Sequence, residues 1–292
     1  MVPGSGGKST PTLRNWTTGL IEATGTPISS ARPIFLDTRH ILYTAAGGRR
    51  DAADQARLCV ASLVPSGHTP AQSCSYAFAL PEFLLYGVSF VDTRACTLET
   101  TPARHGCFYS DPDDRLISIE LIFIDWSGRF IIDVPARTLT RYIAAHPAVP
   151  GQPAAVVPWD AWGTHGARVT HCPGYTSMSW AISGSRRATL LPRSGVDNTT
   201  MLTVLDYSPR RVARAIARGT GNVVRGSEVP AENTGAGFGA LRTMLSCIST
   251  EIPVPDRLAG GMLRATICEN GVLFTKRDAR SNTVIDAWAY TI

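Results

Sequence analysis

The feature that most constrains the fold is the repeated alternation of a short apolar run with a polar turn. Such runs recur roughly every 8–12 residues, a spacing typical of all-β domains rather than of βαβ units. The clearest run, Arg115–Ile124, is followed by a polar turn at Asp125–Gly128 and a second run at Arg129–Asp133, which predicts a hairpin. Asn270-Gly271 lies between two later apolar runs and predicts another hairpin. The 26 Gly and 20 Pro agree with a chain of many short elements.

Two segments show helical rather than strand periodicity. Pro135–Ala145 begins with a proline suited to a first helical turn and places its apolar residues on one face. Pro209–Arg218 follows Ser208, a good N-cap residue, and precedes Gly219. Its arginines lie opposite its apolar residues. A basic amphipathic helix of this kind is typical of a solvated surface, and it can also bind acidic partners or a membrane.

A weak internal repeat refines the all-β prediction. Phe35–Arg39, Phe90–Arg94 and Phe123–Ser127 share an aromatic-apolar-Asp pattern, with separations of 55 and 33 residues. Their mean is close to the period of about 40–45 residues of a propeller blade. We therefore expect one β-propeller-like domain of degenerate WD-type blades over residues 13–292, with two short helical insertions and with a β-sandwich as the alternative. Residues 1–12 are expected to form a flexible tail.

The sequence contains no recognisable catalytic or metal-binding pattern. No two of the six histidines are four residues apart and no Cys-x-x-Cys occurs, so the common zinc spacings are absent. Gly4–Ser9 lacks the first glycine of a phosphate-binding loop. His105 near Cys107, and His171 beside Cys172, are interpreted as buried thiols next to surface imidazoles. We predict a protein without catalytic residues, metal or cofactor.

Charge and cysteine content restrict the partners and the compartment. The 28 Lys+Arg against 23 Asp+Glu give a net charge of +5, but the basic residues are scattered, which argues against a nucleic-acid partner. No apolar run reaches the about 18 residues of a membrane span, and the N-terminus lacks the apolar core of a secretory signal. The seven cysteines without paired spacing indicate reduced thiols. A cytoplasmic or nuclear protein that is not secreted and binds no membrane is expected.

The most distinctive segment is Val-Val-Pro-Trp-Asp-Ala-Trp-Gly, residues 156–163. Trp159 and Trp162 have the spacing of one face of a helical turn that begins after Pro158 and ends at Gly163. The two rings form either an aromatic plug in the core or part of a contact surface.

Several segments in order along the chain carry a family resemblance: Val-Pro-Ala-Arg-Thr-Leu (134–139), Val-Pro-Trp-Asp-Ala-Trp-Gly (157–163), Ile182–Arg186, Leu202–Val212, Cys268–Leu273 and Trp288–Ile292. Together they resemble the C-terminal half of a large, divergent family of fungal F-box proteins, best over about residues 107–292. The resemblance implies a protein-interaction role. In such proteins an N-terminal F-box docks the Skp-type adaptor of a cullin–RING ubiquitin ligase, and the C-terminal β region presents the substrate.

The resemblance does not extend to an F-box. No Leu-Pro-x-Glu helical module occurs in residues 1–60. The chain would then be a substrate-receptor half, a fragment or a stand-alone relative, and a Skp-type adaptor and a cullin are expected as partners only if an F-box is supplied elsewhere.

We therefore predict a non-catalytic protein-binding module. Because Trp and Arg are the commonest residues at interface hot spots, the predicted contact residues are Trp159, Trp162, Arg186 and Arg187. Two alternatives stay open. The first is a carbohydrate-active β-propeller or sandwich enzyme using Asp111, Asp113 or Glu120. The second is a lectin-like module with an open aromatic cup around Trp126, Trp162 or Trp180.

Overall fold

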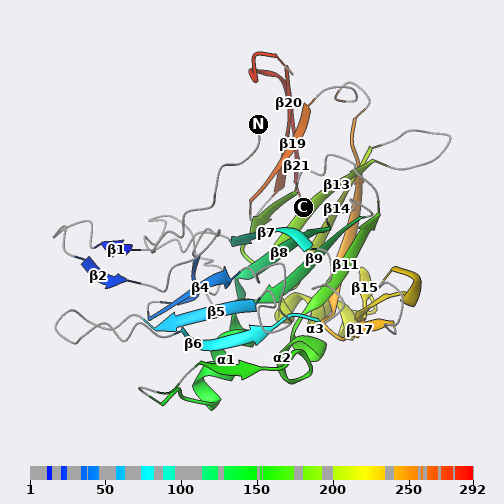
Figure 1. The fold of residues 1–292 in the computed structure, drawn as a ribbon. Coiled ribbons are helices and arrows are strands. Elements are labelled where there is room, and N and C mark those ends of the chain that lie inside the picture. Colours follow the sequence, from blue (N-terminus) through cyan, green and yellow to red (C-terminus); the bar gives the residue numbers. More distant parts are fainter. Residues whose placement is uncertain are drawn as a thin grey trace, which may run out of the picture.

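The structure is a computed structural model that describes most of the central and C-terminal chain. The described residues are 12–14, 21–24, 34–37, 39–45, 57–62, 74–81, 88–95, 114–123, 128–149, 152, 154–173, 180–192, 200–233, 240–255, 258, 262–268, 271–278 and 280–291. Within these ranges the chain forms mostly antiparallel sheets with three short α-helices (Figure 1). The predicted all-β class is confirmed.

The N-terminal part forms a two-stranded and a five-stranded sheet. The small sheet pairs β1 (Thr12–Arg14) with β2 (Ile21–Thr24), so Thr12 of the predicted tail lies in a strand. The large sheet has the order β10-β6-β5-β4-β3. Its strands are β3 (Ile34–Phe35), β4 (His40–Ala45), β5 (Arg57–Ser62), β6 (Cys74–Ala79) and β10 (Ala155–Val157). Strand β10 runs parallel to β6, and the other neighbours are antiparallel.

Two further sheets form the middle of the molecule. The first has the order β11-β9-β8-β7, from β7 (Val88–Ala95), β8 (Leu116–Phe123), β9 (Gly128–Pro135) and β11 (Arg168–Pro173). The antiparallel pairing of β8 with β9 confirms the first predicted hairpin. The second has the order β12-β13-β14-β18-β15, from β12 (Trp180–Ser183), β13 (Arg186–Pro192), β14 (Thr200–Asp206), β15 (Asn222–Val224) and β18 (Cys247–Pro253).

The C-terminal part adds a small sheet and a projecting one. The small sheet pairs β16 (Ser227–Val229) with β17 (Leu241–Thr243). The projecting sheet consists of β19 (Met262–Cys268), β20 (Gly271–Arg277) and β21 (Val284–Thr291), and it rises at the top of Figure 1. Strands β19 and β20 pair with Cys268 opposite Gly271, which confirms the second predicted hairpin.

The two predicted helices form within one residue of their predicted limits, but the predicted number of two is wrong, because the helical turn expected after Pro158 is a third helix. Helix α1 is Ala136–Ala145, directly after Pro135, and α3 is Pro209–Arg218, ending at Gly219 with a left-handed φ of 61°. Helix α2 is Trp159–Gly166 and follows Pro158, but it continues beyond the predicted end at Gly163. A Cβ at Gly163 would lie 2.2 Å from Cε3 of Trp159. The glycine therefore allows the Trp159 ring to pack against the helix rather than ending it.

Two apolar clusters hold the sheets together. The larger lies between the β10-β6-β5-β4-β3 sheet, the β11-β9-β8-β7 sheet and helices α1 and α2, with Phe78, Ile119 and Leu139 fully buried. The other packs β13, β14 and β18 against β19 and β20, and includes Leu202 and Phe274. The face of the β12-β13-β14-β18-β15 sheet that carries Ala188, Leu202 and Val204 is therefore covered by the projecting sheet.

The three segments of the internal sequence repeat do not all adopt the same structure. Asp37 lies in the turn between β3 and β4, Asp92 lies inside β7, and residues 124–127 are outside the described part. The interpretation of these segments as equivalent blade turns is therefore wrong. In the described ranges no sheet closes on itself, and the parallel β10–β6 pair departs from a simple meander. The single domain over 13–292 and its propeller-like or sandwich form stay predictions.

Candidate functional site

The two predicted tryptophan contact residues lie inside the protein. Trp159 and Trp162 are 8% and 4% exposed, with ring centroids 4.8 Å apart in an edge-to-face arrangement. Nε1 of Trp162 donates a hydrogen bond to the carbonyl oxygen of Ala79 at 3.0 Å, and its ring packs edge-on against Phe78. These contacts confirm the aromatic-plug interpretation. The prediction that the two rings contact a partner has no exposed surface to support it.

The two predicted arginine contact residues are buried as well. Arg186 and Arg187 on β13 are 5% and 2% exposed and point to opposite faces of their sheet, as consecutive strand residues do. Nε of Arg186 donates to Oδ2 of Asp206 on β14 at 2.9 Å. Nε of Arg187 lies 3.0 Å from Oδ2 of Asp133 on β9, an ion pair without hydrogen-bond alignment. Because both faces of β13 are covered, neither guanidinium is accessible.

Asp133 is the centre of a buried polar network between two sheets. Its carboxylate accepts hydrogen bonds from Oγ of Ser118 and from the Tyr207 hydroxyl, both at 2.5 Å. Nη2 of Arg187 donates to Oγ1 of Thr170 on β11 at 3.3 Å. The network therefore connects β8, β9 and β11 to β13 and to the residue after β14. A buried charge needs such partners, so this cluster fixes the relative position of the two sheets.

The ionisable groups around this network are held in unreactive forms. Burial, reinforced by the charge of Asp133, raises the pKa of Tyr207 well above its usual range. Burial alone would lower the pKa of Arg187, but its interactions with Asp133, Tyr207 and Cys172 together outweigh burial, and the pKa is raised. Burial also raises the pKa of the Cys172 and Cys247 thiols. Since the thiolate is the nucleophilic form, these thiols are not activated.

The His171–Cys172 pair is arranged differently from the prediction. Cys172 is buried as expected, but His171 is half-buried rather than on the surface. Its ring stacks on Phe130 with centroids 4.7 Å apart, and burial lowers its pKa. The second predicted pair, His105 and Cys107, lies outside the described residues.

The residues named for an enzyme or a lectin are buried where they are described. Glu120 is 4% exposed, and its carboxylate accepts hydrogen bonds from Nη1 of Arg129 at 3.0 Å and from Nε1 of Trp180 at 3.3 Å. Trp180 is itself buried. Neither an accessible carboxylate nor an open aromatic cup is therefore formed by these residues. The other residues named for these alternatives, Asp111, Asp113 and Trp126, lie outside the described part.

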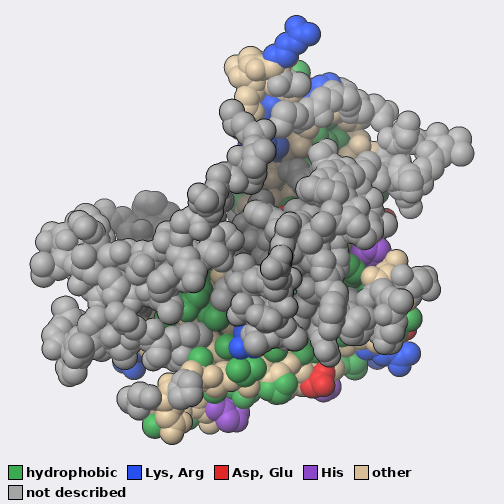
Figure 2. All heavy atoms as spheres, viewed as in Figure 1, with side chains coloured by type: hydrophobic (Ala, Val, Ile, Leu, Met, Phe, Trp, Pro, Cys, Tyr) green, Lys and Arg blue, Asp and Glu red, His purple; other side chains and the backbone are tan. Residues whose placement is uncertain are grey.

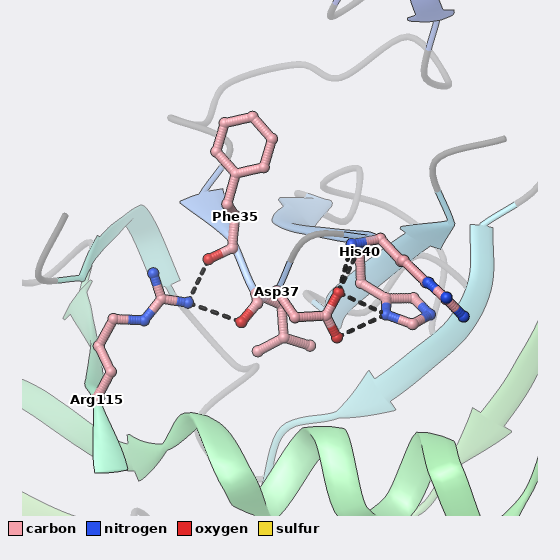
Figure 3. Close-up of polar contacts among 6 residues, drawn as sticks. Phe35, Asp37, His40 and Arg115 are labelled. Carbon is pink, nitrogen blue, oxygen red and sulfur yellow. Dashed lines mark hydrogen bonds and ion pairs between the residues drawn. The ribbon is translucent and has the colours of Figure 1, made fainter. Parts of the chain in front are cut away.

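One polar junction was not singled out in the sequence. A guanidinium nitrogen of the buried Arg115 donates to the carbonyl oxygens of Phe35 and Leu36, and Figure 3 shows it directed at the Phe35 carbonyl. In the same turn, Oδ2 of Asp37 lies 2.8 Å from Nδ1 of His40. An aspartate-oriented imidazole can act as a general base. Among the described residues, however, no Ser, Thr or Cys hydrogen-bonds to this ring, so the junction anchors the β3–β4 turn.

Helix α3 places a basic face on the surface. Its buried face is formed by Val212 and Ala215, and it packs on β15 and β18. The opposite face exposes its arginines: Arg210, Arg211, Arg214 and Arg218. Arg211 lies 3.3 Å from Asp206, whereas none of the described carboxylates pairs with the other three. Figure 2 shows basic side chains, in blue, at the lower right, where β15 and β17 lie in Figure 1.

The projecting β19-β20-β21 sheet exposes apolar side chains. Val284, Ile285 and Tyr290 of β21 and Leu273 of β20 are all exposed. Among the described strands, β20 is the only one that pairs with β21, so the other edge of β21 has no described strand beside it. The sequence indicated these strands through the apolar runs on either side of Asn270-Gly271 and near the C-terminus. The order of apolar and polar residues in these runs did not show which face of the sheet would remain uncovered.

The described residues show neither a metal cluster nor a spanning helix. Within them, no group of three or more His, Cys, Asp and Glu side chains could hold a metal ion. The helices they include are too short or too polar to cross a bilayer. Cys59, Cys172, Cys247 and Cys268 form no disulfide bond.

Comparison with protein-family models, curated proteins and solved structures found no match to this chain.

Proposed function

We propose that this chain is a non-catalytic protein-binding module that receives an extended segment of a partner protein along the edge of β21. The observation that carries the proposal is the exposed edge of this eight-residue strand, flanked by apolar side chains. An extended peptide that joins such an edge gains main-chain hydrogen bonds, and pockets for alternate side chains give specificity.

Beyond Asp286 and the register irregularity beside it, the edge of β21 lacks the protection that natural edge strands carry. Natural proteins guard exposed edge strands with Pro, Lys, bulges or very short strands. Strand β21, with the sequence Val-Ile-Asp-Ala-Trp-Ala-Tyr-Thr, contains no proline or basic residue, and its one register irregularity is near its start, opposite Lys276 and Arg277. The stretch Ala287–Thr291 is therefore open to strand addition.

The side chains around this edge suit an apolar partner strand. Ile285, 58% exposed, leaves apolar surface on β21 uncovered. On the face toward the core, Trp288 stacks on Phe274 with centroids 5.4 Å apart, and Tyr290 lies beside Trp288 at 5.6 Å. An aromatic surface continues in this way from the core to the strand edge. Aromatic residues of this kind dominate the energetics of protein interfaces.

The resemblance to fungal F-box proteins supplies the biological role in this proposal. The bound partner is then a substrate, and the chain is the substrate-recognition part of a ubiquitin-ligase receptor whose F-box is supplied elsewhere. A propeller-like or sandwich architecture would hold the β21 edge rigid, which lowers the entropic cost of binding.

The test is affinity purification of the tagged chain from native extract with quantitative mass spectrometry. Ile285→Lys and Ala289→Lys add the charge that natural edges use as a guard and are expected to remove the specifically bound proteins. Thr266→Lys is the matched control: it adds the same charge at an exposed position on β19, away from the β21 edge, and is expected to retain them.

Each outcome of the purification has a defined meaning. Loss with the two β21 variants alone supports strand addition, and co-purification of a Skp-type adaptor and a cullin supports the ligase role. Equal recovery from wild type and from both β21 variants would refute the edge as the binding site.

A further inference from the structure

The exposed face of α3 is the surface whose chemistry most clearly specifies a ligand. Arg210, Arg214 and Arg218 follow one another at intervals of four residues and therefore lie along one line of the helix. At 1.5 Å per residue this line is about 12 Å long. All three residues are exposed, and none of the described carboxylates forms an ion pair with them.

Apart from Arg218, whose charge in the last turn suits the helix dipole, this arrangement does not serve the stability of the helix. Like charges four residues apart repel one another, and positive charges in a first turn oppose the helix dipole. The first turn of α3 contains no acidic residue, and Arg210 and Arg211 occupy it instead. An anionic partner on this face would reduce the repulsion between the arginines and would also offset the unfavourable interaction of Arg210 and Arg211 with the helix dipole.

The surroundings of α3 extend the same charge. Arg225 is exposed and directly follows β15, against which α3 packs. Arg211 is connected to the interior through Asp206, which also accepts a hydrogen bond from Arg186. That connection holds the first turn of α3 in a fixed position relative to β13. The three outward arginines therefore project from a positioned helix rather than from a loop.

We propose that the α3 face binds an acidic polypeptide segment whose carboxylates recur once per helical turn. Guanidinium groups bind carboxylates through paired, charge-assisted hydrogen bonds, and carboxylates spaced four residues apart match the arginine spacing. This surface is separate from the β21 edge and does not depend on the function proposed for that edge.

A membrane and a nucleic acid fit the same face less well. Helices that lie on membranes insert a wide apolar face, but Val212 and Ala215 of α3 are already buried against strands, and Ile216 is its only large exposed apolar residue. Single-stranded nucleic acids are bound with aromatic stacking platforms, and α3 contains no aromatic residue. Charge complementarity without either feature favours an acidic protein segment.

The test is fluorescence anisotropy of the full chain with a labelled alanine-rich peptide that carries three glutamates, each four residues after the last. A peptide of the same composition with the glutamates distributed around the helix is the ligand control. Wild type is expected to bind the first peptide more tightly than the second, and added salt should weaken the binding. The triple change Arg210→Glu, Arg214→Glu and Arg218→Glu is expected to weaken it by about tenfold or more.

Matched variants separate the face from net charge and from folding. The triple change Arg141→Glu, Arg264→Glu and Arg280→Glu, at exposed positions of α1 and the projecting sheet, makes the same change in net charge away from α3 and should leave the affinity within about twofold of wild type. Circular dichroism should show that the triple variant is folded. Equal affinity of the triple variant and wild type would overturn the proposal. So would tighter, α3-dependent binding to phosphatidylserine vesicles or to a single-stranded oligonucleotide than to the peptide.

Discussion

Two neighbouring arginine pairs look alike in the sequence and have opposite environments in the structure. Arg186 and Arg187 on β13 are buried, and each lies within ion-pair distance of a carboxylate, Asp206 on the neighbouring β14 and Asp133 on β9 of another sheet. Arg210 and Arg211 on α3 are exposed, and the one described carboxylate near them, Asp206, contacts only Arg211. The sequence favoured the first pair as contact residues, but the accessible pair is the second.

The difference follows from what covers each element. Both faces of β13 are packed, so its arginines can be accommodated only because Asp206 and Asp133 lie within ion-pair distance. Helix α3 has only one face packed, so its remaining arginines are exposed to water and form no ion pair with a described carboxylate. Arginines that hold the fold and arginines available for binding are therefore distinguished by the number of covered faces, not by their spacing.

The largest expected effect extends the comparison to the aromatic residues that were also predicted as contacts. Trp162→Ala removes a buried ring and its hydrogen bond to Ala79, and should lower the free energy of unfolding by about 3–5 kcal/mol. Ile216→Ala on the exposed side of α3 is the control and should change it by less than about 0.5 kcal/mol. Urea denaturation measures both. Similar values for the two variants would show that Trp162 is not a core residue.

A smaller effect is expected at the buried polar network. Tyr207→Phe keeps the ring but removes the hydroxyl that donates to Asp133, so a buried carboxylate loses a partner. The free energy of unfolding should fall by about 1–3 kcal/mol. Tyr290→Phe, which removes a hydroxyl from the exposed β21 edge, should have almost no effect in the same assay. An unchanged stability of Tyr207→Phe would show that the network does not hold the sheets together.

The same residue predicts an alkaline pH dependence. Burial raises the pKa of Tyr207 in the folded protein, whereas an unfolded tyrosine loses its proton near pH 10. Its stabilising contribution is complete below about pH 10 and is lost as the pH rises toward the folded pKa. The slope from this residue is at most about 1.4 kcal/mol per pH unit. Urea denaturation at increasing pH should give a shallower decline for Tyr207→Phe, and an unchanged slope would assign the decline to other groups.

The smallest effect tests the exposed side of the comparison. Arg214→Glu changes the repulsion of residue 214 by Arg210 and Arg218 into attraction. It should therefore raise the free energy of unfolding by less than about 1 kcal/mol. Thermal unfolding at low and high salt should show that the gain is reduced by salt. A loss of stability would mean that Arg214 makes a structural contact in the folded chain.

Local elements could be predicted from the sequence because their signals are local. The β8–β9 and β19–β20 hairpins and the limits of α1 and α3 follow from turn residues, proline and glycine. The end of α2 could not be predicted in this way, because Gly163 serves the packing of Trp159 rather than a helix terminus.

Long-range arrangement was less accessible. The pairing of β10 with β6 joins segments far apart in the chain, and no local pattern encodes it. The burial of Arg187 depends on Asp133 of another sheet, more than fifty residues earlier. The exposure of the β21 edge is also a tertiary property, because among the described strands only β20 pairs with β21. Candidate surfaces are determined by these tertiary contacts, so the sequence identified the residue types but not their accessibility.

The most direct test of this account compares Arg187→Met with Arg214→Met in equilibrium urea denaturation. The β13 arginines are expected to hold the fold, whereas the α3 arginines are not. Arg187→Met leaves Asp133 buried without its cation and should lower the free energy of unfolding by about 3–5 kcal/mol. Arg214→Met should change it by less than about 0.5 kcal/mol. Equal losses, or a larger loss for Arg214→Met, would contradict it.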